Sequence, residues 1–201
     1  MTTARSNVLV DYLAERQSAA RDLLWMVGFG FLTALAAQVS IPLPFTPVPL
    51  TGQTFGVLLS GAVLGWRRGF GSQLLYLAAG AAGMPVFAGG GGMAYLLGPT
   101  AGYLWSFPVA AGLLGWLVER GASRRAWTMA PAMFSCSLLI LVAGTAWLGA
   151  VSGYGSRARW WAGFYPFLAG DILKIALVGL ALPKVLRHYQ SRPHPGAPPQ
   201  L

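Results

Sequence analysis

The sequence predicts an all-α integral membrane protein, a six-transmembrane-helix bundle with both termini in the cytoplasm. Of the 201 residues, 55% are hydrophobic and only 9% are charged, whereas soluble domains are about 25% charged. Several apolar runs approach the ~20 residues that a helix needs to cross a bilayer. The basic residues cluster at the ends of these runs. This placement favours membrane helices, and no nucleic-acid partner is expected despite the net charge of +9.

The first predicted helix, approximately 23–41, ends at the proline-rich stretch IPLPFTPVP (41–49). Proline interrupts a helix because it lacks a backbone N–H. The second and third helices are expected at 52–66 and 69–85, on either side of WRRG (66–69). Both are short for membrane spans, so we expect them to tilt little or to pack inside the bundle.

The fourth predicted helix, 99–118, begins after the glycine-rich stretch PVFAGGGGMAYLLGP (85–99). Glycine and proline are the strongest local signals that a helix has ended. The charged turn ERGASRR (119–125) ends this helix, and a long apolar run then predicts the fifth helix at 127–151.

The sixth predicted helix, 164–186, follows the stretch GYGSRARWWAG (153–163). Basic residues are enriched in the cytoplasmic loops of membrane proteins. With the N-terminus inside, the cytoplasmic segments carry eleven basic residues: Arg5, Arg16, Arg21, Arg67, Arg68, Arg120, Arg124, Arg125, Lys184, Arg187 and Arg192. The external loops then carry two, Arg157 and Arg159. The difference predicts that both termini are inside.

Three parts are expected along the chain: a cytoplasmic N-terminal segment (1–22), a membrane domain (23–187) and a disordered cytoplasmic tail (188–201). The tail is rich in proline. The N-terminal segment is charged and lacks the apolar stretch of a cleavable signal peptide. Two interpretations stay open for 7–22. One is a solvated lead-in, and the other is an interfacial amphipathic helix with an apolar side made of Val8, Leu9, Tyr12 and Leu13.

Asp171 and Lys174 carry the main functional signal. Their i,i+3 spacing places them on one helix face, roughly 10 Å below the outer surface. A charge in hydrocarbon costs at least about 2.5–3.5 kcal/mol, so a placement of this kind needs a reason. Either the two charges only neutralise each other, or they bind a polar ligand through an acceptor carboxylate and a donor ammonium.

The predicted external loops add further candidates for a ligand pocket. The loops 41–50, 85–98 and 153–163 all lie on the side nearer the charged pair, which predicts a lidded pocket open to the outside. Gln53, at the outer end of the second helix, either contacts the ligand or forms an interhelical hydrogen bond. The remaining ligand-binding candidates are Phe87, Gly89, Gly90, Tyr95 and Trp147. For Phe87, Gly89 and Gly90 the alternative is a flexible loop, and for Phe87 and Tyr95 it is also an interfacial aromatic belt. Trp147 lies well inside the fifth predicted helix, where it is interpreted as a wall of the pocket.

Small residues recur on one face of the first predicted helix: Gly30, Thr33, Ala34 and Ala37. Such a face allows a second helix to approach closely. It is interpreted either as packing within this chain or as the interface with a second membrane protein.

Several function classes are excluded or disfavoured. The sequence has no G-x-x-x-x-G-K-[ST] motif, so it holds no P-loop ATPase site. Its two histidines, His188 and His194, lie at or beyond the cytoplasmic end of the last helix, too far to serve a hydrolase or a metal site in the bundle. The single Cys136 rules out an intramolecular disulfide. We therefore expect no catalytic residue, no metal and no cofactor.

Three stretches resemble the BioY family, the biotin-binding S components of energy-coupling-factor (ECF) transporters of prokaryotes. They are PLPFTPVPLTGQTFGVLLSGAVLG, LLYLAAGAAGMPVFAGGGGMAYLLGPTAGYLWSFPVAA and FYPFLAGDILKIAL. The resemblance runs from about residue 25 to 186. Within the motif G-D-x-x-K, the ligand-binding residues of the family correspond to Asp171 and Lys174. The glutamine of T-x-Q-T corresponds to Gln53, and the P-V-F-A-G-G loop corresponds to 85–90.

The resemblance implies a multi-pass protein of the prokaryotic plasma membrane that takes up biotin. It also implies a transmembrane coupling subunit and paired ABC-type ATPases that power the uptake, besides the surrounding lipids. Three alternatives remain: a stand-alone biotin facilitator, an S component for another vitamin, and a purely structural membrane subunit. In the last case, Asp171 and Lys174 pair only with each other.

Overall fold

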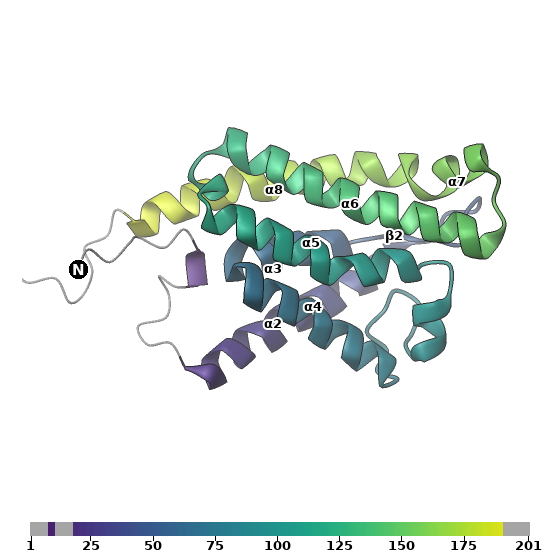
Figure 1. The fold of residues 1–201 in the computed structure, drawn as a ribbon, viewed down its shortest axis with the longest axis horizontal. Coiled ribbons are helices and arrows are strands. Elements are labelled where there is room, and N and C mark those ends of the chain that lie inside the picture. Colours follow the sequence, from purple (N-terminus) through teal and green to yellow (C-terminus); the bar gives the residue numbers. More distant parts are fainter. Residues whose placement is uncertain (1–7, 11–17, 191–201) are drawn as a thin grey trace, which may run out of the picture.

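The computed structural model describes residues 8–10 and 18–190 and shows an elongated helical bundle (Figure 1). The predictions for residues 1–7, 11–17 and 191–201, which include most of the N-terminal segment and the tail, lie outside the described residues. The same holds for Tyr12 and Leu13 of the proposed amphipathic helix. Val8 and Val10 are described, and both are buried in the hydrophobic core.

Seven α-helices lie in the described part of the chain, with two 3₁₀ turns and one two-stranded pairing. The helices are α2 (Ala19–Gln38), α3 (Gln53–Leu64), α4 (Trp66–Ala81), α5 (Ala101–Glu119), α6 (Ala126–Ser152), α7 (Ser156–Gly163) and α8 (Tyr165–Gln190). The 3₁₀ turns are η1 (Met93–Leu97) and η2 (Ala122–Arg124). β1 (Ser40–Ile41) pairs antiparallel with β2 (Leu50–Thr51).

Three of these helices, α2, α5 and α6, are long and apolar enough to cross a membrane. α3 is apolar but has only 12 residues, which fits the expectation that the second helix is short for a span. The structure thus supports a protein with several membrane helices. The number of spans and the side on which the termini lie stay predictions.

Two connections differ from expectation. α7 occupies most of the stretch 153–163, which was predicted as a loop. Gly153 ends α6, but the residues from Ser156 to Ala162 include no proline or glycine, so a helix can form again. In addition, α3 and α4 are separated by Gly65 alone, where a loop was expected at 66–69. Gly65 has φ +81°, a left-handed value that reverses the chain within one residue.

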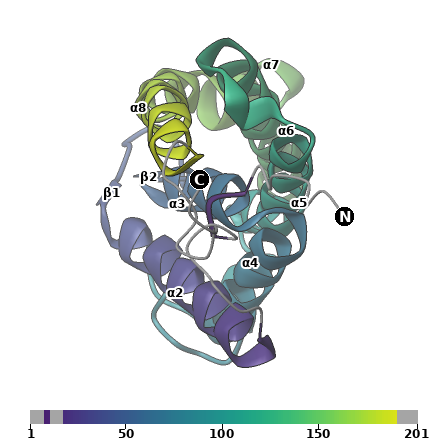
Figure 2. The ribbon, with the colours of Figure 1, turned by 90° about the vertical axis from the view of Figure 1, so that its left-hand side faces the viewer.

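The helices run back and forth, so the connections gather at two ends of the bundle (Figure 1). We call one the α7 end; it holds the β1–β2 connection, the glycine-rich loop with η1, and α7. The other end holds Gly65 and η2. Seen along the bundle, α3 lies near the middle, α2 lies at one edge, and α8 lies beside α6 (Figure 2). All three predicted external loops therefore meet at one end.

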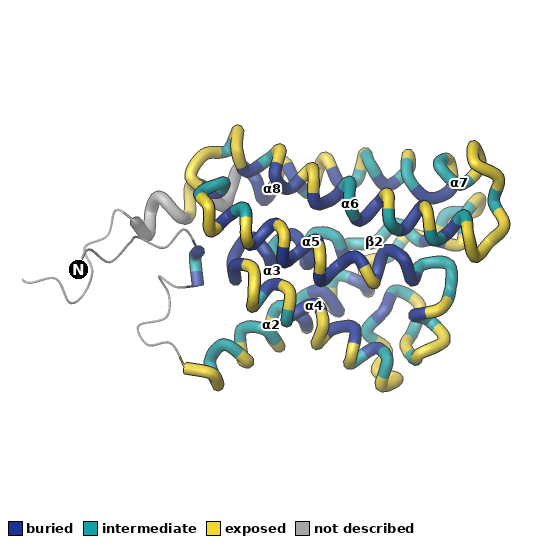
Figure 3. Tube along the Cα trace, viewed as in Figure 1, coloured by how far each residue is buried: buried dark blue, intermediate teal, exposed yellow. Residues whose placement is uncertain are grey.

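The burial pattern shows which faces the bundle needs for its own packing (Figure 3). α5 is the most enclosed of the three long apolar helices. In its most apolar 18-residue segment 72% of the residues are buried, whereas in that of α2 only 17% are buried. α2 exposes apolar side chains along its outer face, among them Leu24, Val27 and Phe31. A peripheral helix of this kind suits contact with lipid.

The small-residue face of α2 turns inward and corrects the prediction of a docking interface there. Thr33 and Ala37 are fully buried, Ala34 is 8% exposed, and Gly30 is also buried. A Cβ atom on Gly30 would lie 3.0 Å from the carbonyl oxygen of Ser72 on α4. The four residues pack α2 against α3 and α4, so the alternative interpretation, packing within the chain, describes them.

This packing gives a testable prediction with a matched control on the same helix. Gly30→Leu is expected to lower the stability by about 1–3 kcal/mol, because the added side chain overpacks the contact with α4. Gly28→Leu should have little effect, because no atom lies within 4 Å of a Cβ at that position. Thermal unfolding of both variants in detergent checks this. Equal stability of the two would show that the inner face of α2 tolerates bulk.

Candidate functional site

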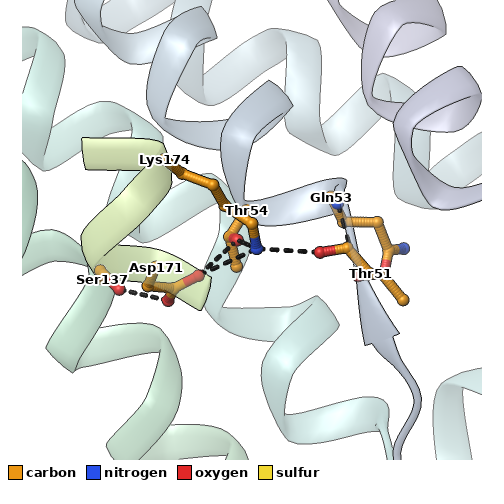
Figure 4. A network of polar contacts seen from close by, with 6 residues as sticks. All are labelled: Thr51, Gln53, Thr54, Ser137, Asp171 and Lys174. Carbon is orange, nitrogen blue, oxygen red and sulfur yellow. Dashed lines mark hydrogen bonds and ion pairs between the residues drawn. The ribbon is translucent and has the colours of Figure 1, made fainter. Parts of the chain in front are cut away.

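Asp171 and Lys174 of α8 (Tyr165–Gln190) point toward Thr54 of α3 and Ser137 of α6 in the interior of the bundle (Figure 4). Asp171 is 1% exposed, and the side chain of Lys174 is 17% exposed. The ammonium Nζ of Lys174 lies 3.0 Å from Oδ1 of Asp171. The i,i+3 spacing therefore forms a direct ion pair that points away from lipid.

Neighbouring elements already satisfy this ion pair. Thr54 of α3 donates its hydroxyl hydrogen to Oδ1 of Asp171 at 2.8 Å, and Ser137 of α6 donates to Oδ2. The ammonium of Lys174 also donates to Oγ1 of Thr54 at 2.6 Å and to the carbonyl oxygen of Thr51 at 2.9 Å. The two charges are therefore hydrogen-bonded by hydroxyls and a backbone carbonyl of the chain itself.

The remaining hydrogen-bonding capacity differs between the two charges. An ammonium has three N–H donors, and all three of Lys174 are used. A carboxylate has about four acceptor positions, and Asp171 uses three of them. One acceptor position of Asp171 is therefore unused. A ligand acceptor reaches Lys174 only by replacing one of its present partners.

A pocket with about 510 Å³ of empty space, part of it open to solvent, lies against the pair. The polar residues that line it are Thr51, Gln53, Thr54, Tyr95, Thr100, Tyr103, Asp171 and Lys174. The apolar residues that line it are Val48, Pro49, Ala88, Leu104, Phe107, Ile140, Leu141 and Phe167. Such a pocket suits a small ligand that combines polar groups with an apolar body.

Gln53 lines this pocket, and its amide is also engaged in hydrogen bonds. Its Oε1 accepts from the hydroxyl of Thr51 at 2.9 Å. Its Nε2 donates to the hydroxyl of Tyr76 on α4 at 2.6 Å. The interhelical bond and the position in the pocket, considered as alternatives from the sequence, occur together.

Tyr95 of η1 also lines the pocket. Burial raises the pKa of its phenol above the usual value. The hydroxyl therefore stays protonated at neutral pH and remains a hydrogen-bond donor.

The other candidates from the glycine-rich loop do not line the pocket. Phe87 is 1% exposed and stacks on Tyr95 with ring centroids 5.1 Å apart. Gly90 closes a tight turn with Phe87 and has φ +132°, a conformation that favours glycine. A Cβ on Gly89 would lie 3.4 Å from the ring of Tyr95. Within this turn it is Ala88 that lines the pocket.

Trp147 does not line the pocket either. Its Nε1 donates to the carbonyl oxygen of Gly98 at 2.9 Å, and its Cβ region packs against Gly102 of α5. Trp147 therefore connects the end of the glycine-rich loop to α6 and supports the loop.

Several pocket residues were not among the sequence candidates: Thr54, Thr100, Tyr103, Phe107, Phe167 and, in contact with Asp171, Ser137. Thr54 is adjacent to Gln53, so it was within reach of the sequence argument. Ser137 gave no usable signal, since a serine in an apolar helix can bond to a carbonyl of its own helix. Within residues 8–10 and 18–190, no group of three or more His, Cys, Asp or Glu could hold a metal ion.

Comparison with known proteins adds independent findings. The sequence model of the BioY family matches residues 6–191. A probable biotin transporter BioY from Lysinibacillus sphaericus is 45% identical over 105 residues, which are 52% of this chain and 53% of the relative; this match thus spans about half of each protein. A probable biotin transporter BioY from Pyrococcus horikoshii is 39% identical over 158 residues, which cover 78% of this chain and 91% of the relative.

Among solved structures, the crystal structure of the S-component for biotin from an ECF-type ABC transporter superposes with a TM-score of 0.77. The superposition covers 89% of this chain and 96% of that one, at 22% sequence identity. At this identity the likeness shows a shared fold.

Proposed function

This chain belongs to the BioY family, and from that premise we propose that it is the biotin-binding S component of an ECF transporter. It is a transporter subunit rather than an enzyme. The observation that carries the proposal is the ion pair of the buried Asp171 and the partly buried Lys174, beside a pocket lined by both polar and apolar residues.

The chemistry of biotin matches this pocket. Its ureido ring offers two N–H donors and a carbonyl, its thiophane ring is apolar, and its side chain ends in a carboxylate. The free acceptor position of Asp171 receives a ureido N–H. Lys174 meets a carbonyl or carboxylate oxygen and gives up one of its present partners to do so. The apolar lining residues, among them Phe107 and Phe167, receive the thiophane ring.

The other candidates divide into contact and support. Gln53 and Tyr95 line the pocket and are proposed as ligand contacts. Four candidates do not line the pocket and are proposed to support the loop through their contacts with Tyr95 and Gly98: Phe87, Gly89, Gly90 and Trp147. Their replacement is expected to alter biotin binding through the shape of the loop.

We further propose six membrane spans, α2, α3, α4, α5, α6 and α8, with both termini in the cytoplasm and the α7 end outside. The excess of eleven basic residues over two supports this orientation. The membrane is the plasma membrane of a prokaryote, in keeping with bacterial and archaeal relatives. Biotin then enters the pocket from the external side.

Release of biotin requires other subunits. Tight binding cannot reverse itself, so a free-energy source must favour a state of lower affinity. The sequence has no P-loop. A transmembrane coupling subunit and ABC-type ATPases are the partners that supply this energy, and release into the cytoplasm follows their ATP hydrolysis.

Ligand specificity tests the proposal directly. Biotin at 100 times its dissociation constant should stabilise the purified protein by about 2.7 kcal/mol, whereas thiamin and riboflavin should leave its thermal unfolding unchanged. Stabilisation by another vitamin and not by biotin would contradict the assignment. Uptake of biotin by the purified chain alone in liposomes, without saturable binding, would favour the facilitator instead.

A further inference from the structure

Tyr76 of α4 does not line the pocket, yet it contacts Gln53 and Phe107, which do. The side chain is 2% exposed. Its hydroxyl accepts a hydrogen bond from Nε2 of Gln53 at 2.6 Å and donates one to the carbonyl oxygen of Val86 at 3.1 Å. Val86 directly precedes Phe87, at the start of the glycine-rich loop. The hydroxyl therefore links that loop to Gln53, which lines the pocket.

The connection continues without a break to the charged pair. Gln53 accepts from the hydroxyl of Thr51, and the carbonyl oxygen of Thr51 accepts from Lys174. Lys174 donates to Asp171. A single chain of hydrogen bonds thus runs from the glycine-rich loop through α4, α3 and β2 to the carboxylate on α8.

The ring of Tyr76 supports the same loop by packing. It meets the ring of Phe87 edge-on, with centroids 5.4 Å apart, and stacks near Phe107 at 6.5 Å. Phe87 in turn stacks on Tyr95. Gly80, one turn further along α4, leaves the space for Phe87, because a Cβ there would lie 2.0 Å from that ring. The ring therefore supports Tyr95 through Phe87, and the hydroxyl separately binds Gln53.

We propose that the Tyr76 hydroxyl is a positioning group that holds the first part of the glycine-rich loop, residues 85–92, in a fixed place relative to the ion pair of Asp171 and Lys174. The loop and the pair then meet the ligand as one preorganised surface. The proposal rests on the function proposed above for the identity of the ligand. It assigns Tyr76 no contact with that ligand.

Preorganisation acts mainly on the lifetime of the complex. Without the hydroxyl, the carbonyl of Val86 and one N–H of Gln53 lose their partner, and the loop opens more often. A ligand held under the loop then leaves faster, whereas its arrival at the open pocket changes little. Most affinity differences between variants of one binding site do arise in the dissociation rate.

The test compares Tyr76→Phe with Ser72→Ala in the full-length purified protein. Tyr76→Phe removes only the hydroxyl and keeps the ring. Ser72 is equally buried on the same helix, and its hydroxyl donates to Gly69 within α4, so Ser72→Ala controls for loss of a buried hydroxyl. For Tyr76→Phe we expect biotin dissociation about tenfold faster, the equivalent of one lost hydrogen bond, with association within about twofold of the original protein. Ser72→Ala should change neither rate.

A second measurement does not depend on the ligand. Amide hydrogen exchange in the ligand-free protein should accelerate across residues 86–92 in Tyr76→Phe and stay unchanged in Ser72→Ala. Gln53→Met breaks the same link from α3 and should accelerate the same amides, which covers the case in which Tyr76→Phe fails to fold.

The outcomes separate the two proposals. If biotin binds and Tyr76→Phe keeps both the original dissociation rate and the original loop exchange, the positioning role is overturned and the proposed function stands. If biotin does not bind the original protein, the proposed function fails, and the exchange measurement alone decides the role of Tyr76. Equal acceleration in Ser72→Ala would show a general loss of packing and also overturn the role.

Discussion

Asp171→Asn is expected to weaken biotin binding by about 2–4 kcal/mol, which is roughly 30- to 1,000-fold. Asparagine keeps the shape of the side chain and one acceptor oxygen. Its NH₂ group, however, replaces the second acceptor and faces a donor, either Ser137 or the pair formed by Thr54 and Lys174. The substitution also removes the charge and the acceptor proposed for the ureido N–H. Isothermal titration of the purified variant measures the loss.

The matched control is Asp22→Asn. Asp22 lies on α2 in an ion pair with Arg68, with the atoms 2.8 Å apart, near the end of the bundle opposite the pocket. It is the same substitution in an ion pair, so it should leave the affinity for biotin unchanged. Original affinity in Asp171→Asn would refute the assignment of the carboxylate as a ligand contact.

Lys174→Met is expected to cost about 3–5 kcal/mol of stability, because it leaves the carboxylate of Asp171 buried without its counter-charge. Methionine fills a similar volume, so the effect is electrostatic rather than a cavity. In the double variant Asp171→Asn/Lys174→Met no charge remains unpaired. Most of the stability should then return, while biotin binding stays lost. Thermal unfolding and biotin titration of the three variants measure the two properties separately.

This comparison also decides whether the pair is only structural. If the double variant is stable and binds biotin with the original affinity, the two charges serve only each other, and the structural alternative is correct. If the double variant stays as unstable as Lys174→Met, the cost arises from packing and not from the unpaired carboxylate.

The pattern of breakers in the sequence was enough to place most of the helices. Proline and glycine act on the backbone locally, so the ends of α2, α5 and α6 could be predicted to within a few residues. The same rule missed α7, because the flanking Gly153 and Gly155 concealed a short stretch free of breakers. The ion pair of Asp171 and Lys174 was equally accessible, since i,i+3 spacing on one helix sets the separation of two side chains.

The face of α2 with Gly30 and Ala34 shows where a local pattern stops being informative. Small residues allow close approach, whether the approaching helix belongs to the same chain or to another protein. Only the packing of α4 on this face, with the carbonyl of Ser72 close to Gly30, distinguishes the two. A sequence pattern describes the surface of a helix and not its neighbour.

The sequence by itself predicted the membrane helices, the family resemblance and the two charges within an apolar run. Each of these depends on composition or on spacing along one element. The tertiary structure alone decided what surrounds those charges. Ser137, Thr54 and Thr51 reach them from α6, α3 and β2, and Tyr76 ties the glycine-rich loop to them through Gln53. These contacts join residues 10 to 123 positions apart, and only the folding of the helices against one another brings them within hydrogen-bonding distance.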